Sequence, residues 1–188
     1  MSDLCADVVA RLPEMSHVNM AQTTVTFAQA RSNVLHGMQA KLTPMRFENG
    51  SLYRERNGRT WTIQRLRGTG GQEQLYILTF YLPRFLQHSF QEKLTTIFHE
   101  LWHIHPEFNG DFRRFTGRCV MHSRSQKEFD ALAEQLSQKW LGLHPPKSLY
   151  EFLECDFSEL HRRHGSIHGL KIAIPKLIPV PAVPRQET

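Results

Sequence analysis

The feature that most constrains this chain is the segment 99–103, an H-E-x-x-H pattern inside the apolar run 94–104. On a helix, residues four apart share a face, so the imidazoles of His99 and His103 can reach one metal ion with Glu100 beside them. Imidazoles bind Zn²⁺ at about 2.0–2.1 Å, and a third protein ligand leaves a position for a water whose pKa falls toward about 7. A neighbouring carboxylate can take the proton of that water. The segment therefore predicts a zinc site with the chemistry of peptide hydrolysis.

The residues around this pattern predict a helix with defined ends. Ser89-Phe90-Gln91-Glu92 matches a capping box at its start, and Pro106 opposes continuation beyond about His105. We therefore expect a helix of about sixteen residues, an ordinary length for a globular domain. Apolar residues at helical spacing give this helix a stripe that the histidine pair borders, namely Leu94, Ile97, Phe98, Leu101 and Trp102.

Composition and cysteine usage narrow the class of protein. The chain is 40% hydrophobic and 22% charged, as in soluble globular proteins, and it has no apolar run long enough to span a membrane. The segment 1–4 lacks the basic region and apolar core of a signal peptide. Three widely spaced cysteines, Cys5, Cys119 and Cys155, argue against a disulfide framework. We therefore expect a cytoplasmic protein that does not enter a membrane.

Hydrophobic periodicity predicts further elements around the histidine helix. The segment 75–82 is apolar at nearly every position, so we expect a strand covered on both faces. It leads within a few residues into the histidine helix, and its edge would offer a place for an extended peptide to pair. The other expected elements are a helix over 3–12, a strand over 23–27, and a helix from a capping box at 125–128 to about Gly142. The segment 28–41 is ambiguous.

Two Asn-Gly pairs predict a meander of short strands between these elements. Asn-Gly favours the type I′ hairpin turn, because both central residues need positive φ. The expected strands are 45–48, 52–56 and 60–64, joined at Asn49-Gly50 and Asn57-Gly58. The arginines crowding this meander are Arg54, Arg56, Arg59, Arg65 and Arg67. With a net charge of +5, the chain favours acidic partners such as nucleic acid. Few aromatic residues lie among these arginines, so a solvated sheet face is favoured over a nucleic-acid surface.

A zinc site needs a third protein ligand, and the spacing leaves three candidates. The arrangement H-E-x-x-H-x-x-G-x-x-H is excluded, because its Gly and third His would fall on Pro106 and Asn109. His122 is the preferred ligand, since it lies just before the capped start of the second helix. Asp111, in a turn, and Glu128, in the capping box, are the alternatives.

The segment 96–106, followed by Gly110 and Arg113-Arg114, resembles the phage-type metallopeptidases. In those proteins an H-E-L-x-H-I segment precedes a proline, a glycine-containing turn and an arginine. More distantly, the chain is similar to the SprT-like minimal zincins, which have a third His before a further helix. The resemblance covers about residues 75–142 and implies a zinc peptidase fold. It also implies the roles of His99, His103 and His122 as zinc ligands and of Glu100 as general base.

These observations together predict an α+β, zincin-like domain over residues 1–143. In it, a small, mostly antiparallel sheet packs against the histidine helix and the helix after His122. Residues 144–188 are expected to form a C-terminal extension whose Pro-rich tail lies along the protein surface and limits access to the site.

The expected activity is zinc-dependent hydrolysis of a peptide or protein substrate, with Glu100 as general base on a zinc-bound water. Arg113, Arg114 or Tyr81 would donate to the oxyanion that forms in this reaction. The alternative is a non-enzymatic zincin-like module that binds nucleic acid or a protein partner through its basic strands.

Overall fold

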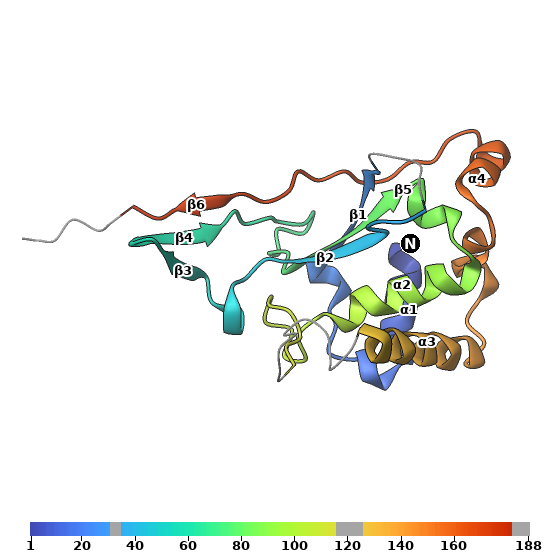
Figure 1. Cartoon of the computed structure of the whole chain (residues 1–188), viewed down its shortest axis with the longest axis horizontal. Helices are drawn as coiled ribbons and strands as arrows, with labels where there is room; N and C mark the ends of the chain where they lie inside the picture. The colour runs from blue at the N-terminus through green and yellow to red at the C-terminus, as the bar shows by residue number, and fades with distance from the viewer. Residues whose placement is uncertain (31–34, 116–125, 182–188) are drawn as a thin grey trace, which may run out of the picture.

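A computed structural model of the chain shows an α+β fold and describes residues 1–30, 35–115 and 126–181 (Figure 1). The strands are β1 (Thr23–Gln29), β2 (Ala40–Pro44), β3 (Tyr53–Arg56), β4 (Arg59–Ile63), β5 (Tyr76–Leu82) and β6 (Leu177–Pro179). The α-helices are α1 (Ser2–Arg11), α2 (Phe90–Trp102), α3 (Gln126–Gly142) and α4 (Phe157–His164). Short 3₁₀ turns are η1 (Pro13–Met15), η2 (Met20–Gln22), η3 (Glu48–Gly50), η4 (Arg84–Gln87), η5 (Lys147–Leu149) and η6 (Glu151–Glu154).

The strands form two small sheets, ordered β1-β5-β2 and β3-β4-β6. β1 runs parallel to β5, whereas the pairings of β2 with β5, β3 with β4 and β4 with β6 are antiparallel. The expectation of an α+β fold with mostly antiparallel strands is therefore confirmed. The prediction that the segment 75–82 has an exposed edge is wrong, because β5 lies between β1 and β2. In the described part of the chain, the sheet edge nearest α2 belongs to β2, which begins at the end of the ambiguous segment 28–41.

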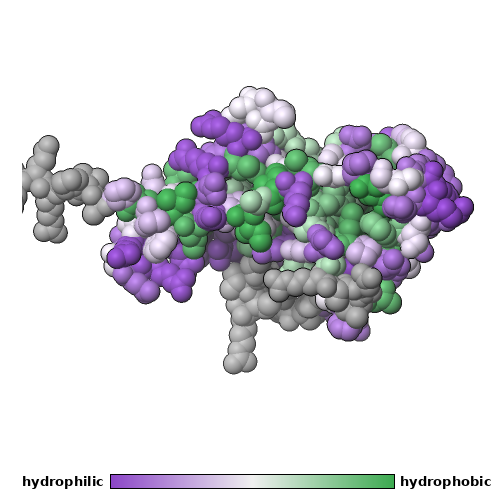
Figure 2. Space-filling view, turned by 90° about the horizontal axis from the view of Figure 1, so that it is seen from above, coloured by the Kyte–Doolittle hydropathy of each residue, from purple (hydrophilic) through white to green (hydrophobic). Residues whose placement is uncertain are grey.

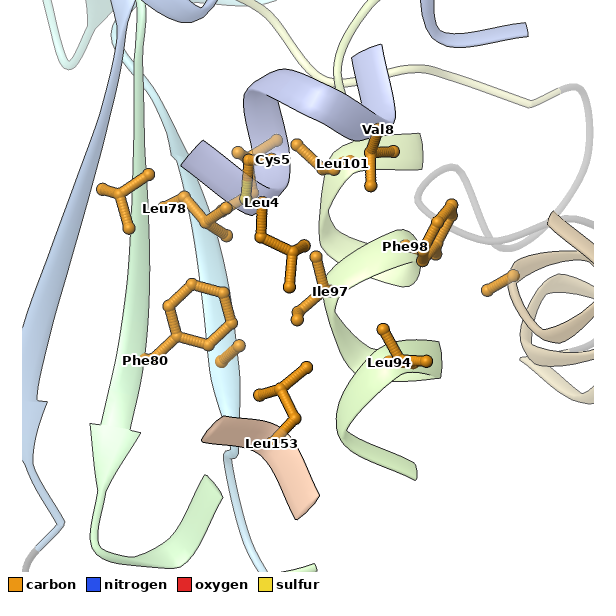
Figure 3. Packing of buried hydrophobic residues seen from close by; sticks show 14 of the residues in the cluster. Leu4, Cys5, Val8, Leu78, Phe80, Leu94, Ile97, Phe98, Leu101 and Leu153 are labelled. Atoms are coloured by element: carbon orange, nitrogen blue, oxygen red, sulfur yellow. The ribbon is translucent and has the colours of Figure 1, made fainter. Parts of the chain in front are cut away.

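The hydrophobic core lies between the β1-β5-β2 sheet and helices α1 and α2 (Figure 3). Alternate side chains of β5 enter it, as expected for a strand with one face on a core. Burying a Leu, Ile or Phe side chain stabilises a fold by roughly 1.5–3 kcal/mol, so α2 is held firmly against the sheet. The residues labelled in this packing are Leu4, Cys5, Val8, Leu78, Phe80, Leu94, Ile97, Phe98, Leu101 and Leu153. α3 packs on α2 through Phe98 and Trp140, whose ring centroids are 6.1 Å apart.

The start of α2 is the predicted capping box. The Ser89 hydroxyl accepts a hydrogen bond from the Glu92 amide (3.3 Å), and the Glu92 carboxylate accepts from the Ser89 amide (2.9 Å). The helix has 13 residues and ends at Trp102, earlier than expected, with His103 as its C-cap. The reason is a chain reversal, because Ile104 pairs with Phe112 in an antiparallel bridge.

Only one of the two Asn-Gly pairs forms a hairpin. Asn57 (φ 53°) and Gly58 (φ 69°) both have positive φ and join β3 to β4 as predicted. Asn49 and Gly50 also have positive φ but belong to η3, so the strand expected over 45–48 is wrong. The Asn49 amide donates to the Asp111 carboxylate (3.0 Å), so a contact from a distant turn takes the place of the hairpin bonds.

Part of the extension after residue 143 packs into the core. Leu153, Cys155 and Leu160 are buried there. Lys93 on α2 is 2% exposed, and its ammonium donates to the carbonyls of Leu153 (3.0 Å) and Cys155 (2.8 Å). Burial lowers the pKa of this lysine. The segment 147–160 is therefore tied to the same helix that carries the histidine pair.

The described residues after α4, 165–181, lie along the protein surface, as expected of the tail. The Leu170 carbonyl accepts from the Phe27 amide of β1 (2.9 Å), and the Lys176 carbonyl accepts from the Gln64 amide (2.8 Å). β1 is the strand at the far side of its sheet from β2, so the tail runs on the side opposite the edge near α2. No helix in the described ranges is long and apolar enough to cross a membrane.

Candidate metal centre

The last turn of α2 brings two imidazoles to a metal-binding separation. The Nε2 atoms of His99 and His103 lie 3.1 Å apart. Two nitrogens that each lie about 2.0–2.1 Å from a tetrahedral zinc ion are separated by about 3.3–3.4 Å. The helical period places both rings on one side of α2, as the sequence predicts. The observed pair therefore fits two ligands of one zinc ion.

A carboxylate on α3 contacts the other nitrogen of His99. The His99 Nδ1 atom lies 2.7 Å from the Asp130 Oδ1 atom. An ionised carboxylate only accepts hydrogen bonds, so this contact places the ring proton on Nδ1 and leaves the Nε2 lone pair directed at the other histidine. Metal-bound histidines commonly have such a partner. His99 therefore has the kind of hydrogen-bond partner that would orient a metal-binding imidazole.

Asp130 is not among the site residues predicted from the sequence, because the helix after His122 was considered only as a source of metal ligands. The available signal was its position directly after Phe129, on the apolar face of the predicted helix. Phe129 is 2% exposed, and its ring centroid lies 4.6 Å from that of each imidazole. α3 thus supplies both the carboxylate and the aromatic surface that hold the two rings in position.

Glu100 lies beside the histidine pair and reaches the edge strand. One carboxylate oxygen accepts a hydrogen bond from the Leu42 amide of β2 (2.6 Å). Burial raises the pKa of Glu100 to about 7, although the Leu42 amide and the charge of Lys41 oppose this shift. A carboxyl group with a pKa near neutrality both accepts and donates protons efficiently. Glu100 is therefore a buried carboxyl group, next to His99, whose pKa would suit proton transfer near neutral pH.

His99 and Glu100 line a hollow of about 450 Å³ between β2, α2 and α3. Gln39 and Ala40 form its wall on the β2 side, and Asp130 lies on the α3 side. An edge strand offers backbone groups to an extended chain that lies beside it. The hollow therefore places His99 and Glu100 beside a surface suited to a peptide, while His103 lies behind them and is buried.

The turn after His103 is held by one buried phenol. Tyr76 is 0% exposed, and its hydroxyl donates to the Asp111 carbonyl (2.8 Å). The same oxygen accepts from the amides of Gly110 (3.0 Å) and His105 (3.3 Å). Gly110 has a φ of +87°, which favours glycine. These bonds fix the chain just beyond the second histidine.

The structure does not bring the alternative third ligands to the histidine pair. The buried Asp111 carboxylate pairs with the Arg114 guanidinium (2.8 and 3.1 Å), and Glu128 is exposed on α3. Within the described residues, no three His, Cys, Asp or Glu side chains gather around one metal position. His122, the preferred third ligand, and Cys119 lie in the segment 116–125, outside the described residues.

None of the side chains considered as oxyanion donors lines the hollow. Arg113 donates to the Trp102 carbonyl (2.8 Å) and stacks over the Trp102 ring at 3.8 Å, while Arg114 is paired with Asp111. These arginines stabilise the turn instead. Tyr81 lies on the central strand β5. No protein-family model, curated protein or solved structure matches the chain.

Proposed function

We propose that this protein is a zinc-dependent metallopeptidase with a zincin-like fold, in which His99 and His103 bind zinc and Glu100 is the general base. The observation that carries the proposal is the pair of Nε2 atoms 3.1 Å apart, with Asp130 hydrogen-bonded to the other nitrogen of His99. Bound zinc would polarise the scissile carbonyl and acidify a water molecule. His122 is proposed as the third ligand, since zinc sites of this type use three protein donors.

The protein groups around the pair have separate roles in this proposal. Glu100 takes a proton from the attacking water and later gives it to the leaving amine, and the Leu42 amide keeps its carboxyl group oriented. The substrate is a peptide or protein segment that lies in extended form beside β2. The cytoplasmic location belongs to the proposal as well and agrees with two cysteines, Cys5 and Cys155, that are free and buried.

Zinc content and peptide cleavage, measured on the same variants, test this function. Glu100→Gln should keep zinc and lose cleavage of a fluorogenic unfolded protein by about 10²–10⁴-fold. His99→Ala should lose both zinc and cleavage. Zinc retained by His99→Ala, or cleavage unchanged in Glu100→Gln, would overturn the proposal. A wild-type protein that binds zinc and cleaves nothing would favour the non-enzymatic alternative.

A further inference from the structure

The β3-β4-β6 sheet projects from the body of the protein at the end away from α3 and α4 (Figure 1). Its register places Arg54 opposite Trp61 and Arg56 opposite Arg59. Residues that are directly opposite, or two apart on one strand, share a face of a sheet. These four side chains therefore share one face, which we call the arginine face, while Glu55 points to the other side.

The guanidinium charges of the arginine face have no ion-pair partner in the described part of the chain. Like charges directly opposite one another destabilise a sheet, and Arg56 and Arg59 are such a pair. Among the described residues, no carboxylate lies within 4.0 Å of the Arg54, Arg56 or Arg59 guanidinium, whereas Arg46 pairs with Glu73 at 2.8 Å. An anion from outside the protein would remove this repulsion. The face is therefore suited to a ligand with several negative charges.

An apolar surface lies among these charges. The three arginines, with Asn57, line a hollow of about 510 Å³ whose other walls are Phe47, Trp61 and Leu177. Leu177 comes from β6, so the tail supplies part of the wall of this hollow. In Figure 2, hydrophilic and hydrophobic residues lie side by side on the projecting end of the molecule. Arginine binds phosphate through paired donors, and an indole offers a flat surface on which a base can stack.

We propose that the arginine face binds single-stranded nucleic acid, with phosphates on the three arginines and an unpaired base against Trp61. In a duplex each base is stacked between its neighbours, so only a single strand can present the face of a base to this hollow. An acidic peptide would satisfy the guanidiniums but would bring no flat ring to the indole. The site lies apart from the histidine pair, so this binding does not depend on the peptidase proposal.

Fluorescence anisotropy of the full chain with labelled oligothymidylate and oligouridylate tests the proposal. Both oligonucleotides should bind. Log affinity should fall linearly with log salt, and the steepness of this slope should decrease by about 2 in Arg54→Gln/Arg56→Gln/Arg59→Gln, because each phosphate contact contributes about 0.7 for a single strand. Trp61→Leu should weaken binding about tenfold with the slope unchanged. Unchanged binding in the triple variant would overturn the proposal. So would a duplex of equal length, or polyglutamate, that binds as tightly as the single strand.

A matched control removes the same charge elsewhere on the surface. Lys147→Gln/Arg162→Gln/Arg163→Gln changes three exposed residues and should retain most of the affinity and the slope. If this variant lost as much affinity as the arginine-face variant, binding would follow net charge and the proposal would fail. Replacing the three arginines of the face by lysine preserves the charge and should keep the slope. This variant shows whether the loss of binding in the glutamine variant comes from lost phosphate contacts or from a damaged sheet. Zinc content should be the same in all these variants.

Discussion

The Nδ1 atom of His99 on α2 lies 2.7 Å from the Oδ1 atom of Asp130 on α3. This contact joins the helix that carries both histidines to the helix that packs against it. Because the carboxylate sets the orientation and the tautomer of the imidazole, it should influence metal affinity without touching the metal ion. Asp130 is therefore a positioning residue in the proposed site.

Asp130→Ala should weaken zinc binding by about 10–100-fold while the fold is preserved. The physical reason is that the His99 ring loses both its fixed orientation and the negative charge that makes it a better donor. Competition with a chromogenic chelator measures the affinity. Glu134→Ala is the matched control, because Glu134 lines the same hollow and lies one turn further along α3. Equal affinities in the wild type and Asp130→Ala would contradict this role.

Tyr76→Phe should destabilise the protein by on the order of 3 kcal/mol, because the amide of Gly110, the amide of His105 and the carbonyl of Asp111 lose their shared partner. Urea unfolding monitored by tryptophan fluorescence measures the change. Tyr53→Phe removes the same oxygen from a side chain that is 52% exposed and should change stability little. The contact between Tyr76 and the turn would be unimportant if the two variants were equally stable. The looser turn should also reduce zinc affinity.

The ion pair between Arg46 and Glu73 should make stability depend on pH. The hydrogen bond from Arg46 lowers the pKa of Glu73 below its usual value of 4.5, and Arg65 and Arg67 act in the same direction. The carboxylate therefore stabilises the fold above pH 4.5, and this contribution is lost as the pH falls through the lowered pKa.

Arg46→Gln should reduce the loss of stability on acidification by roughly 1 kcal/mol relative to the wild type, since this partly buried pair is the largest cause of the shift. Urea unfolding at neutral pH and below pH 4.5 gives the comparison. In a Glu73→Gln background the same substitution should have no such effect. A pH dependence equal to that of the wild type would mean that other carboxylates dominate.

Deleting residues 171–188 should leave zinc content and peptide turnover unchanged. Leu170, just before this segment, bonds to β1, and the described part of the segment pairs with β4. β1 is the strand of the β1-β5-β2 sheet that lies away from β2 and Glu100. Sequence reasoning placed the tail where it would limit access to the site, and on that basis the truncated chain would be faster. Turnover of an unfolded substrate by the two proteins distinguishes these expectations. A faster truncated protein would show that the arm reaches the site.

The elements that sequence reasoning predicted correctly have local signals. The capping box at Ser89 determines where α2 begins, and Asn57-Gly58 determines the β3-β4 hairpin, because both are decided by residues a few positions apart. The spacing of His99 and His103 similarly places two imidazoles together, since a helix has a fixed period.

The contacts that were missed join residues far apart in the chain. Asn49-Gly50 has the composition of a hairpin, yet Asp111 binds the Asn49 amide, and nothing near residue 49 indicates that contact. Gln39 and Ala40 lie at the end of a segment without clear periodicity, so the strand beside Glu100 was not anticipated. The one signal for Asp130 is its place next to Phe129 on the apolar face of a helix, and that face does not indicate that the helix packs against the histidines. Local pattern therefore predicted the histidine pair, whereas its surroundings depend on tertiary packing.

The pairing of Trp61 with Pro179 has a consequence for how the projecting sheet forms. The β3-β4 hairpin closes over a two-residue turn, but β6 joins it only by closing a loop that contains most of the chain, and the entropy lost in closing a loop rises with its length. Contacts of such wide sequence separation are slow to form. The amides of Gln64 and Val180, which bond to Lys176 and Thr60, should therefore exchange with solvent through a local opening that leaves β5 protected. β6 would then separate from β4 while the β1-β5-β2 sheet remains folded.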